Sequence, residues 1–260
     1  MSFNQWLLFK IPTVVLGALI VGSAVILSVA GLLIVRMFVP HYKLKLHNDI
    51  AGPIFATLGV VYAVLLAFVV VIVWQNFDRS NSDVQGEANC LVDMYRDAEA
   101  FPSDFRNGIR ALVEEYAQAV VNDEWRSMER GESSPLVRDV LKKMWSSYSG
   151  YEPKTEAEKT FYAESVRKMN ELGELRRMRL MDSRTGVNSL LWFVLIVGGI
   201  VTITFTFFFG SENLTAQMIM ALLLAVLISL ILFTILAMDF PFTGSISISP
   251  EPFTQTAANW

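Results

Sequence analysis

The sequence predicts an all-α membrane protein with four transmembrane helices in two hairpins and a helical cytoplasmic domain inserted between the second and third spans. Hydrophobic residues make up 53% of the chain and gather in blocks of about 20 or more. These blocks lack the alternation of apolar and polar residues that is typical of outer-membrane strands. The charged residues gather mainly in one central segment, which predicts a single water-facing domain.

The predicted boundaries follow the ends of the apolar blocks. The first hairpin lies in residues 1–74 behind an interfacial N-terminal segment, with spans at about 11–35 and 53–74. The helical cytoplasmic domain covers residues 75–189. The second hairpin covers residues 190–238, with spans at about 190–209 and 214–238, and a C-terminal tail occupies residues 239–260.

The N-terminal segment carries Trp6 and Lys10, residue types that favour the membrane–water interface. The first apolar block is longer than the 7–15 residues of a signal-peptide core, so we interpret it as a retained span rather than a leader. It contains small residues such as Gly17, Gly22 and Gly31. Small side chains let helices approach closely in lipid, so this span is expected to pack against protein along part of its face.

The second span begins a long helix. Gly52-Pro53 is a helix start signal, and the apolar stretch from Pro53 to Trp74 is roughly 33 Å long at about 1.5 Å per residue. That length fits a hydrocarbon core of about 30 Å. Charged residues follow Trp74 without a proline until Pro102, so we expect the helix to leave the bilayer and continue into water.

Three further helices are predicted in the central domain. Phe105, Ile109 and Leu112 begin an apolar stripe that runs from Ser103 to about Glu129. Ser134-Pro135 is an N-cap followed by proline, and Thr155-Glu156-Ala157-Glu158 is a capping box. The last of these helices extends toward the third span.

Positive charges near the span ends predict the orientation. The side with the N-terminus and the domain holds six of them, against Arg36, Lys43 and Lys45 on the other side. This distribution favours the inner (cytoplasmic) membrane with both termini in the cytoplasm. The six are Lys10, Arg79, Arg176, Arg177, Arg179 and Arg184. The last four could instead form an electropositive vestibule or a lipid-headgroup site.

The loop before the second span holds His41, His47, Asn48 and Asp49. These residues do not have the spacing of a metal site, and no metal is expected. One interpretation of Asn48 and Asp49 is a polar helix entry, with the carboxylate near the positive end of the helix dipole. The other is an ion-contact ring at the mouth of a pore.

No catalytic motif is present: the sequence lacks a P-loop, a G-x-S-x-G element, H-E-x-x-H and a dinucleotide fingerprint. An enzyme and a cofactor are therefore not expected. The formal net charge of −4 argues against a nucleic-acid partner. Cys90, the single cysteine, lies within a helical pattern and is expected to be an inert packing residue.

One face of the second span could line a pore. Val64, Phe68 and Ile72 recur every four residues, with Val61 and Gln75 near the same face. The face could equally be lipid-facing or packed in a core. In a symmetric oligomer it would form a hydrophobic neck, which can gate by dewetting.

Several motifs resemble a bestrophin-like family of bacterial four-span membrane proteins. They are His47-Asn48-Asp49-x-Ala51-Gly52, the segment from Tyr62 to Val70 with Trp74, Asp239-x-Pro241-Phe242-x-Gly244 and Ser249-Pro250-Glu251-Pro252. The layout is also distantly similar to that of bestrophins, which are pentameric anion channels with an apolar neck on the second span. The chain lacks their acidic calcium-clasp run after the fourth span, where only Asp239 and Glu251 lie nearby.

The sequence and this resemblance together predict a homo-oligomeric ion channel in the lipid bilayer, with a pentamer implied by the resemblance. Permeant small ions would pass along the second span and its cytoplasmic extension. Asp49 and the arginines favour opposite ions, and the resemblance tips the expected preference slightly toward anions. The alternative function is a membrane-anchored scaffold or signalling protein without conductance.

Overall fold

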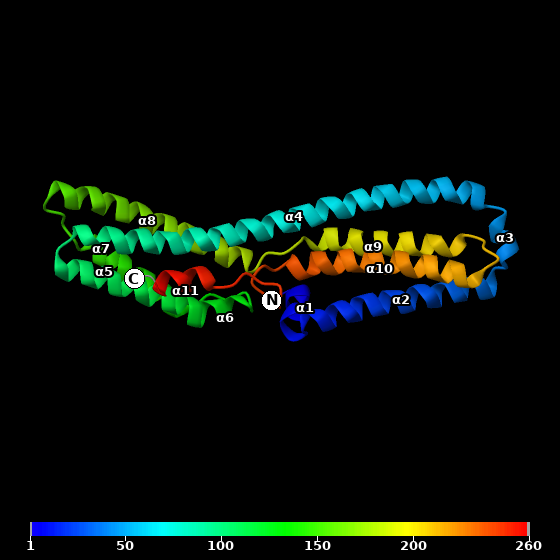
Figure 1. Ribbon diagram of the computed structural model, residues 1–260, viewed down its shortest axis with the longest axis horizontal. Coiled ribbons are helices and arrows are strands. Elements are labelled where there is room, and N and C mark those ends of the chain that lie inside the picture. The colour runs from blue at the N-terminus through cyan, green and yellow to red at the C-terminus, as the bar shows by residue number, and fades with distance from the viewer. Residues whose placement is uncertain (1, 259–260) are drawn as a thin grey trace. The chain divides into compact units, whose positions relative to one another are not determined.

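The computed structural model describes residues 2–258, and within that range its regular elements are all helices, without strands (Figure 1). The chain forms two compact units. Residues 10–75 and 186–239 make up the membrane unit. Residues 1–9, 76–185 and 240–260 make up the helical domain, so both ends of the chain belong to the same unit as the central polar segment.

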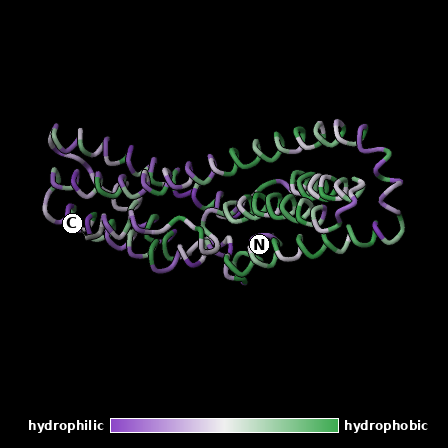
Figure 2. The backbone as a smooth tube through the Cα atoms, turned by 45° about the vertical axis from the view of Figure 1, so that its right-hand side comes forward, coloured by the Kyte–Doolittle hydropathy of each residue, from purple (hydrophilic) through white to green (hydrophobic). Residues whose placement is uncertain are grey.

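The four predicted spans are confirmed as helices that are long and apolar enough to cross a membrane. They appear as the most hydrophobic stretches of the backbone in Figure 2. The spans are α2 (Thr13–Phe38), the first part of α4 (Asn48–Asp97), α9 (Ser189–Phe205) with a 3-10 turn at Thr206–Phe208, and α10 (Leu214–Met238). A short helix, α3 (His41–Lys45), connects α2 to α4.

The predicted two-hairpin layout is not confirmed, because the first two spans have other main neighbours. The main neighbour of α2 is α10. The buried face of α4, with Tyr62 and Leu66, packs instead against Leu195 of α9 and Ile228 of α10. Figures 1 and 2 show α9 and α10 between α2 and α4. Two helices that follow one another in sequence are thus separated by the other two.

Small residues in α2 permit its close packing, as expected. A Cβ atom on Gly17 would lie 2.9 Å from Cζ of Phe233 in α10. One on Gly31 would lie 2.6 Å from Cε2 of Phe207 in the 3-10 turn after α9. Both glycines therefore accept an aromatic ring where any side chain would collide with it.

A second close approach joins α4 to α9. The Tyr62 hydroxyl donates a 2.7 Å hydrogen bond to the Leu195 carbonyl oxygen. Its ring lies over Gly198, where a Cβ atom would be 2.6 Å from Cε2 of the tyrosine. A bare backbone at this point of α9 is what allows the tyrosine to reach its acceptor.

We expect Gly198→Val to destabilise the membrane unit, because the added side chain must displace the buried Tyr62 ring. Overpacking of this kind costs about 1–3 kcal/mol. Thermal unfolding of the detergent-solubilised protein measures the loss as a lower Tm. Gly22→Val is the matched control, since a Cβ on Gly22 meets no described atom within 4 Å. Equal Tm values for the two variants would show that the Tyr62–Gly198 contact is not stabilising.

The helical domain contains the water-facing part of α4 and seven further helical segments among the described residues. They are α1 (Phe3–Lys10, of which Lys10 belongs to the membrane unit), α5 (Ser103–Ala119), a π-helical segment (Val120–Glu124), α6 (Trp125–Met128), α7 (Pro135–Ser149), α8 (Glu156–Asp182) and α11 (Glu251–Ala258). A 3-10 turn at Ala98–Ala100 ends α4. Their shared core is built on buried residues such as Met94, Tyr116 and Met144.

The predicted caps in this domain are confirmed. The Ser134 hydroxyl accepts a 3.3 Å hydrogen bond from the Val137 N–H at the start of α7. The Thr155 hydroxyl accepts one of 3.1 Å from the Glu158 N–H at the start of α8. The start of α4 differs from the prediction, because this helix begins at Asn48 and contains Pro53 in its second turn. Proline has no N–H group, so at this point the helix lacks the hydrogen bond from residue 53 to the Asp49 carbonyl oxygen.

The C-terminal segment returns to the helical domain and packs into its core. Phe242 and Phe253 are buried, and their rings lie 5.7 Å and 6.0 Å from the Trp125 ring. The Trp125 indole N–H donates a 3.2 Å hydrogen bond to the Ile248 carbonyl oxygen. Gly244 has φ of +92°, a conformation that favours glycine. Within residues 245–249 only Ile248 is buried, and Ile246 is 46% exposed. Helix α11 is not predicted from the sequence.

Candidate functional site

The face of α4 that carries the neck candidates is uncovered in the protomer. Val61 and Phe68 are each 66% exposed, and Val64 and Ile72 about half exposed. Gln75 is exposed as well. The buried residues of the span lie on a different face, at Tyr62, Leu66, Val69 and Val73. The stripe is therefore not part of the protomer core, which leaves lipid or another copy of the chain as its neighbour.

The uncovered face continues past the apolar stretch. Arg79 and Ser82, about one and two turns beyond Gln75, are also exposed. The helix that carries all of these residues is unbroken over its 50 residues. One exposed strip of α4 thus changes from apolar to polar along its length.

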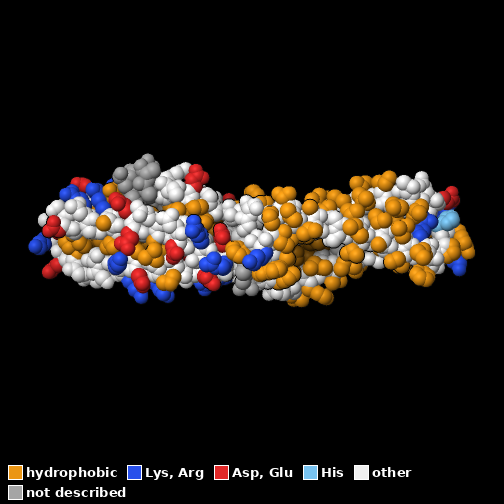
Figure 3. All heavy atoms as spheres, turned by 90° about the horizontal axis from the view of Figure 1, so that it is seen from below, with side chains coloured by type: hydrophobic (Ala, Val, Ile, Leu, Met, Phe, Trp, Pro, Cys, Tyr) orange, Lys and Arg blue, Asp and Glu red, His pale blue; other side chains and the backbone are white. Residues whose placement is uncertain are grey.

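The visible surface of the membrane unit is mostly apolar. Figure 3 shows hydrophobic side chains covering most of that face, with charged side chains at its end. Lys45 and Glu212 form an exposed ion pair of 2.7 Å between α3 and the α9–α10 loop. The charged end therefore belongs to the loops that connect the spans.

Asn48, one of the pore-mouth candidates, holds the backbone of the α9–α10 loop. Its amide nitrogen donates to the Gly210 carbonyl oxygen and its amide oxygen accepts from the Gly210 N–H, both at 2.9 Å. A Cβ on Gly210 would lie 2.1 Å from the backbone nitrogen of Lys45, so this loop and α3 are in tight contact. Asp49 is exposed in the first turn of α4. Of the two candidates, only Asp49 presents its side chain to the outside.

We expect Asn48→Ala to lower the free energy of unfolding by about 1–3 kcal/mol, because it leaves two polar backbone groups of Gly210 without their partner. Thermal unfolding measures the loss, and hydrogen exchange at residues 209–211 should increase. Asp49→Ala on the adjacent exposed position is the control and should leave both readouts unchanged. A stable Asn48→Ala variant with altered ion flux would instead support a direct contact with ions.

Two of the four arginines expected in a vestibule are buried in a network of ion pairs. Arg179 donates to Glu87 through Nε (2.7 Å) and Nη2 (2.8 Å), and Nη2 also lies 2.9 Å from Glu124 Oε2. Arg176 donates to both carboxylate oxygens of Glu124. The Tyr116 hydroxyl completes the network with a 2.7 Å hydrogen bond to Glu87 Oε1. Two positive and two negative side chains are thus brought together in the domain interior.

This burial corrects the vestibule prediction for Arg176 and Arg179. Arg179 is fully buried and Arg176 is 7% exposed, so neither presents its charge to an aqueous space in the protomer. Arg177 and Arg184 remain exposed. We did not predict the acidic partners, because Glu87 lies 92 residues from Arg179 along the chain. The three-residue spacing of Arg176 and Arg179, which places both on one face of α8, was the available signal.

The π-helical segment places Glu124 in this network. Burial alone would raise the pKa of the Glu124 carboxyl group, but Arg179 and Arg176 offset that effect and hold the pKa below its ordinary value. Burial raises the pKa of Tyr116 well above its usual value, so this hydroxyl stays a donor. Glu124 therefore remains ionised at neutral pH.

A family model of the Bestrophin-like domain matches residues 22–253. This chain belongs to the Bestrophin-like family. No curated protein matches it.

Solved structures share the fold of this Bestrophin-like protein. A point mutant of a bacterial bestrophin homologue from Klebsiella pneumoniae matches with a TM-score of 0.72 and 12% identity, covering 92% of this chain and 97% of that chain. The same homologue solved by Zn-SAD phasing gives a TM-score of 0.68 and 12% identity, covering 91% and 95%. The similarity therefore extends over both units.

The motifs that resemble the family have structural partners in this Bestrophin-like protein. Asn48 binds Gly210, as described above. The Asp239 carboxylate accepts hydrogen bonds from the Val187 N–H (2.5 Å) and the Trp192 indole N–H (3.2 Å), which ties the end of α10 to the approach to α9. Phe242 and Gly244 shape the segment that enters the helical domain. The family motifs therefore include residues, such as Asn48 and Asp239, that stabilise the connections between helices.

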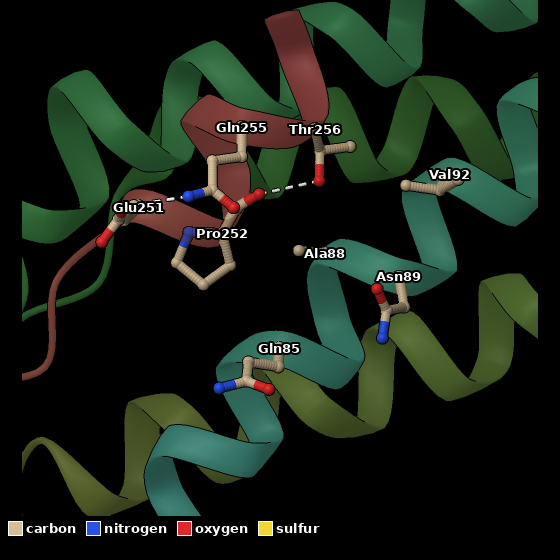
Figure 4. Close-up of a pocket in the computed structure, with 8 residues that line it drawn as sticks. All are labelled: Gln85, Ala88, Asn89, Val92, Glu251, Pro252, Gln255 and Thr256. Atoms are coloured by element: carbon tan, nitrogen blue, oxygen red, sulfur yellow. Dashed lines mark hydrogen bonds between the residues drawn. The ribbon is translucent and has the colours of Figure 1, made fainter. Parts of the chain in front are cut away.

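A polar cleft of about 590 Å³ lies between α4 and α11 of the helical domain (Figure 4). Gln85 and Asn89 line it from α4, and Glu251 and Gln255 from α11. The Gln255 amide nitrogen donates a 2.9 Å hydrogen bond to Glu251 Oε1, so part of the polar lining is already paired.

Proposed function

We propose that this protein is an oligomeric ion channel whose pore is lined by α4 and its extension in the helical domain. The observation that carries the proposal is the exposed strip of α4, apolar from Val61 to Ile72 and polar from Gln75 onward. A narrow apolar neck that opens into a wider polar passage requires such a sequence of residues.

The neck would consist of rings of Val64, Phe68 and Ile72, one residue from each subunit. The three side chains lie one turn apart on an exposed face, so facing copies can approach along it. An apolar constriction blocks ions when water leaves it, and a small widening restores the water column. Gating by wetting and drying of this neck is therefore part of the proposal.

A pore of this kind is incomplete in a single chain. The proposed assembly is a homo-oligomer, with five copies as the number that the resemblance implies. The proposed location is the inner membrane, with the helical domain and both termini in the cytoplasm. The lipid bilayer, other copies of the chain and the permeant ions are its partners.

The charge preference of the proposed channel depends on few exposed groups. Asp49 would attract cations at one mouth, while Arg177 and Arg184 would attract anions at the other. Arg176 and Arg179 add little, since Glu87 and Glu124 neutralise them. We propose a slight preference for anions.

Ion flux through the purified protein in liposomes tests the function. Reversal potentials measured under chloride and potassium gradients identify the permeant ion, and the mass of the detergent-solubilised protein gives the number of subunits. We expect current from the protein alone. Absence of current with and without calcium, and over a range of pH and voltage, would overturn the channel and favour the membrane-anchored scaffold.

A further inference from the structure

A deep apolar crevice of about 530 Å³ lies on the membrane unit between three spans. Ile20, Ala24 and Gly31 of α2 form one wall, Gly199 and Ile203 of α9 another, and Ile228 of α10 contributes from the third helix. The small side chains and bare backbone at Ala24, Gly31 and Gly199 give the crevice its depth. The lining residues come from these three helices and from Phe207 in the 3-10 turn after α9, and none of the described lining residues comes from α4.

The lining of the crevice is mostly apolar. Four hydroxyl groups line it, at Ser23, Ser28, Thr204 and Ser229, and the three serine hydroxyls donate to the backbone carbonyl oxygens of Ile20, Ala221 and Ala225. Hydroxyl groups that are already paired offer little to a polar ligand. An apolar cavity of this kind stays dry and binds apolar molecules.

Its depth in the span limits the occupant further. The lining residues of α2 run from Ile20 to Gly31, and α2 itself runs from Thr13 to Phe38. Each end of the crevice is therefore seven residues, roughly 10 Å, from an end of the helix. A lipid headgroup stays at the membrane surface, so only its hydrocarbon chain reaches this depth.

The size of the crevice distinguishes an alkyl chain from a transmembrane helix of another protein copy. A helix segment as long as the crevice, with a diameter of about 10 Å, occupies roughly 1,300 Å³, so a helix would lie largely outside the crevice. A hydrocarbon chain is a single file of methylene groups and is far thinner. If α4 faces the pore axis, as the proposed function has it, a crevice built without α4 can open toward the lipid.

We infer that this crevice is a binding site for one phospholipid acyl chain, which lies between α2, α9 and α10 and is recognised by its hydrocarbon alone. The acyl chain contacts protein on three sides and is held longer than the lipids around it. This inference goes beyond the proposed channel, and only its orientation relative to the pore rests on that proposal.

Photolabelling tests the site. The protein is reconstituted in phosphatidylcholine vesicles that contain a fraction of phosphatidylcholine with a diazirine at the end of one acyl chain, and labelled residues are mapped after irradiation. We expect labelling of the wild type near Ala24 to be several-fold higher than near Ile26, which is 69% exposed on another face of α2. Equal labelling of the two would overturn the site, because it describes an ordinary lipid shell.

Two matched substitutions in α2 sharpen the test. Ala24→Phe fills the crevice and should lower labelling of its walls several-fold. Ala30→Phe adds the same ring at an exposed position outside the crevice lining and should leave that labelling unchanged. Elution volume and Tm confirm that both variants fold. Unchanged labelling in a folded Ala24→Phe variant would overturn the site, and the wild-type map stands alone if that variant does not fold.

A second vesicle composition separates chain recognition from headgroup recognition. Phosphatidylglycerol that carries the same diazirine chain should label the crevice equally, and a strong headgroup dependence would contradict binding by hydrocarbon alone. Ion flux measured on the same vesicles keeps the two proposals distinct. Labelling without current would reject the channel and retain the site, whereas uniform labelling with current would do the reverse.

Discussion

Arg179→Met is expected to lower the free energy of unfolding by about 3–5 kcal/mol, the cost of removing one partner from a buried ion pair. Methionine fills similar space but leaves Glu87 buried with only the Tyr116 hydroxyl beside it. Glu124 keeps Arg176. Tryptophan fluorescence during denaturant unfolding suits the measurement, because the Arg179 guanidinium lies 5.4 Å from the Trp125 ring centre.

Two controls identify the cause. Arg177→Met removes an exposed arginine from the same helix and should change stability by less than about 0.5 kcal/mol. The double variant Glu87→Gln/Arg179→Met restores charge balance in the interior and should recover much of the loss, since a buried pair is often replaceable by neutral groups. If the double variant were no more stable than Arg179→Met, lost packing rather than uncompensated charge would be the cause.

Phe68→Ala is expected to raise ion flux strongly, because it removes the largest side chain from the proposed neck. Widening an apolar constriction favours a continuous water column. A reduction of the barrier by about 1.4 kcal/mol is enough for a tenfold rise in flux. Liposome flux assays at equal protein density measure the change.

Phe193→Ala is the matched control for this variant. Phe193 is 63% exposed, close to the 66% of Phe68, but it belongs to α9 and not to α4. Its removal should leave flux at the wild-type level. An equal rise in both variants would indicate general loosening of the membrane unit, and an unchanged Phe68→Ala variant would remove Phe68 from the gate.

The parts of the fold that depend on local sequence could be predicted. Continuous apolarity located the four spans, and the caps at Ser134 and Thr155 located α7 and α8. Which spans pack together could not be predicted, because lipid is as apolar as the helices and gives hydropathy no preference among neighbours. Gly17 and Gly31 indicated close packing of α2, but their ring partners, Phe233 and Phe207, lie in distant parts of the sequence.

In the candidate site, too, the features that depend on local sequence could be predicted and the contacts between distant residues could not. The four-residue spacing of Val64, Phe68 and Ile72 placed them on one face of a helix, and the structure shows that face uncovered. The role of Arg176 and Arg179 was missed, because arginines that precede a span have the same pattern whether they face water or pair inside a domain. Only the fold brings Glu87 and Glu124 to them.

The continuity of α4 restricts how the proposed gate can move. Phe68 and Glu87 lie on one unbroken helix, so turning the helix about its own axis to withdraw the ring would also turn the carboxylate. That carboxylate forms an ion pair with Arg179 and accepts a hydrogen bond from Tyr116, and breaking these contacts would cost several kcal/mol. In the proposed channel, these contacts of Glu87 would therefore resist rotation of α4 about its axis. Opening is left to tilting or separation of whole subunits, or to changes of side-chain rotamer at Phe68 itself.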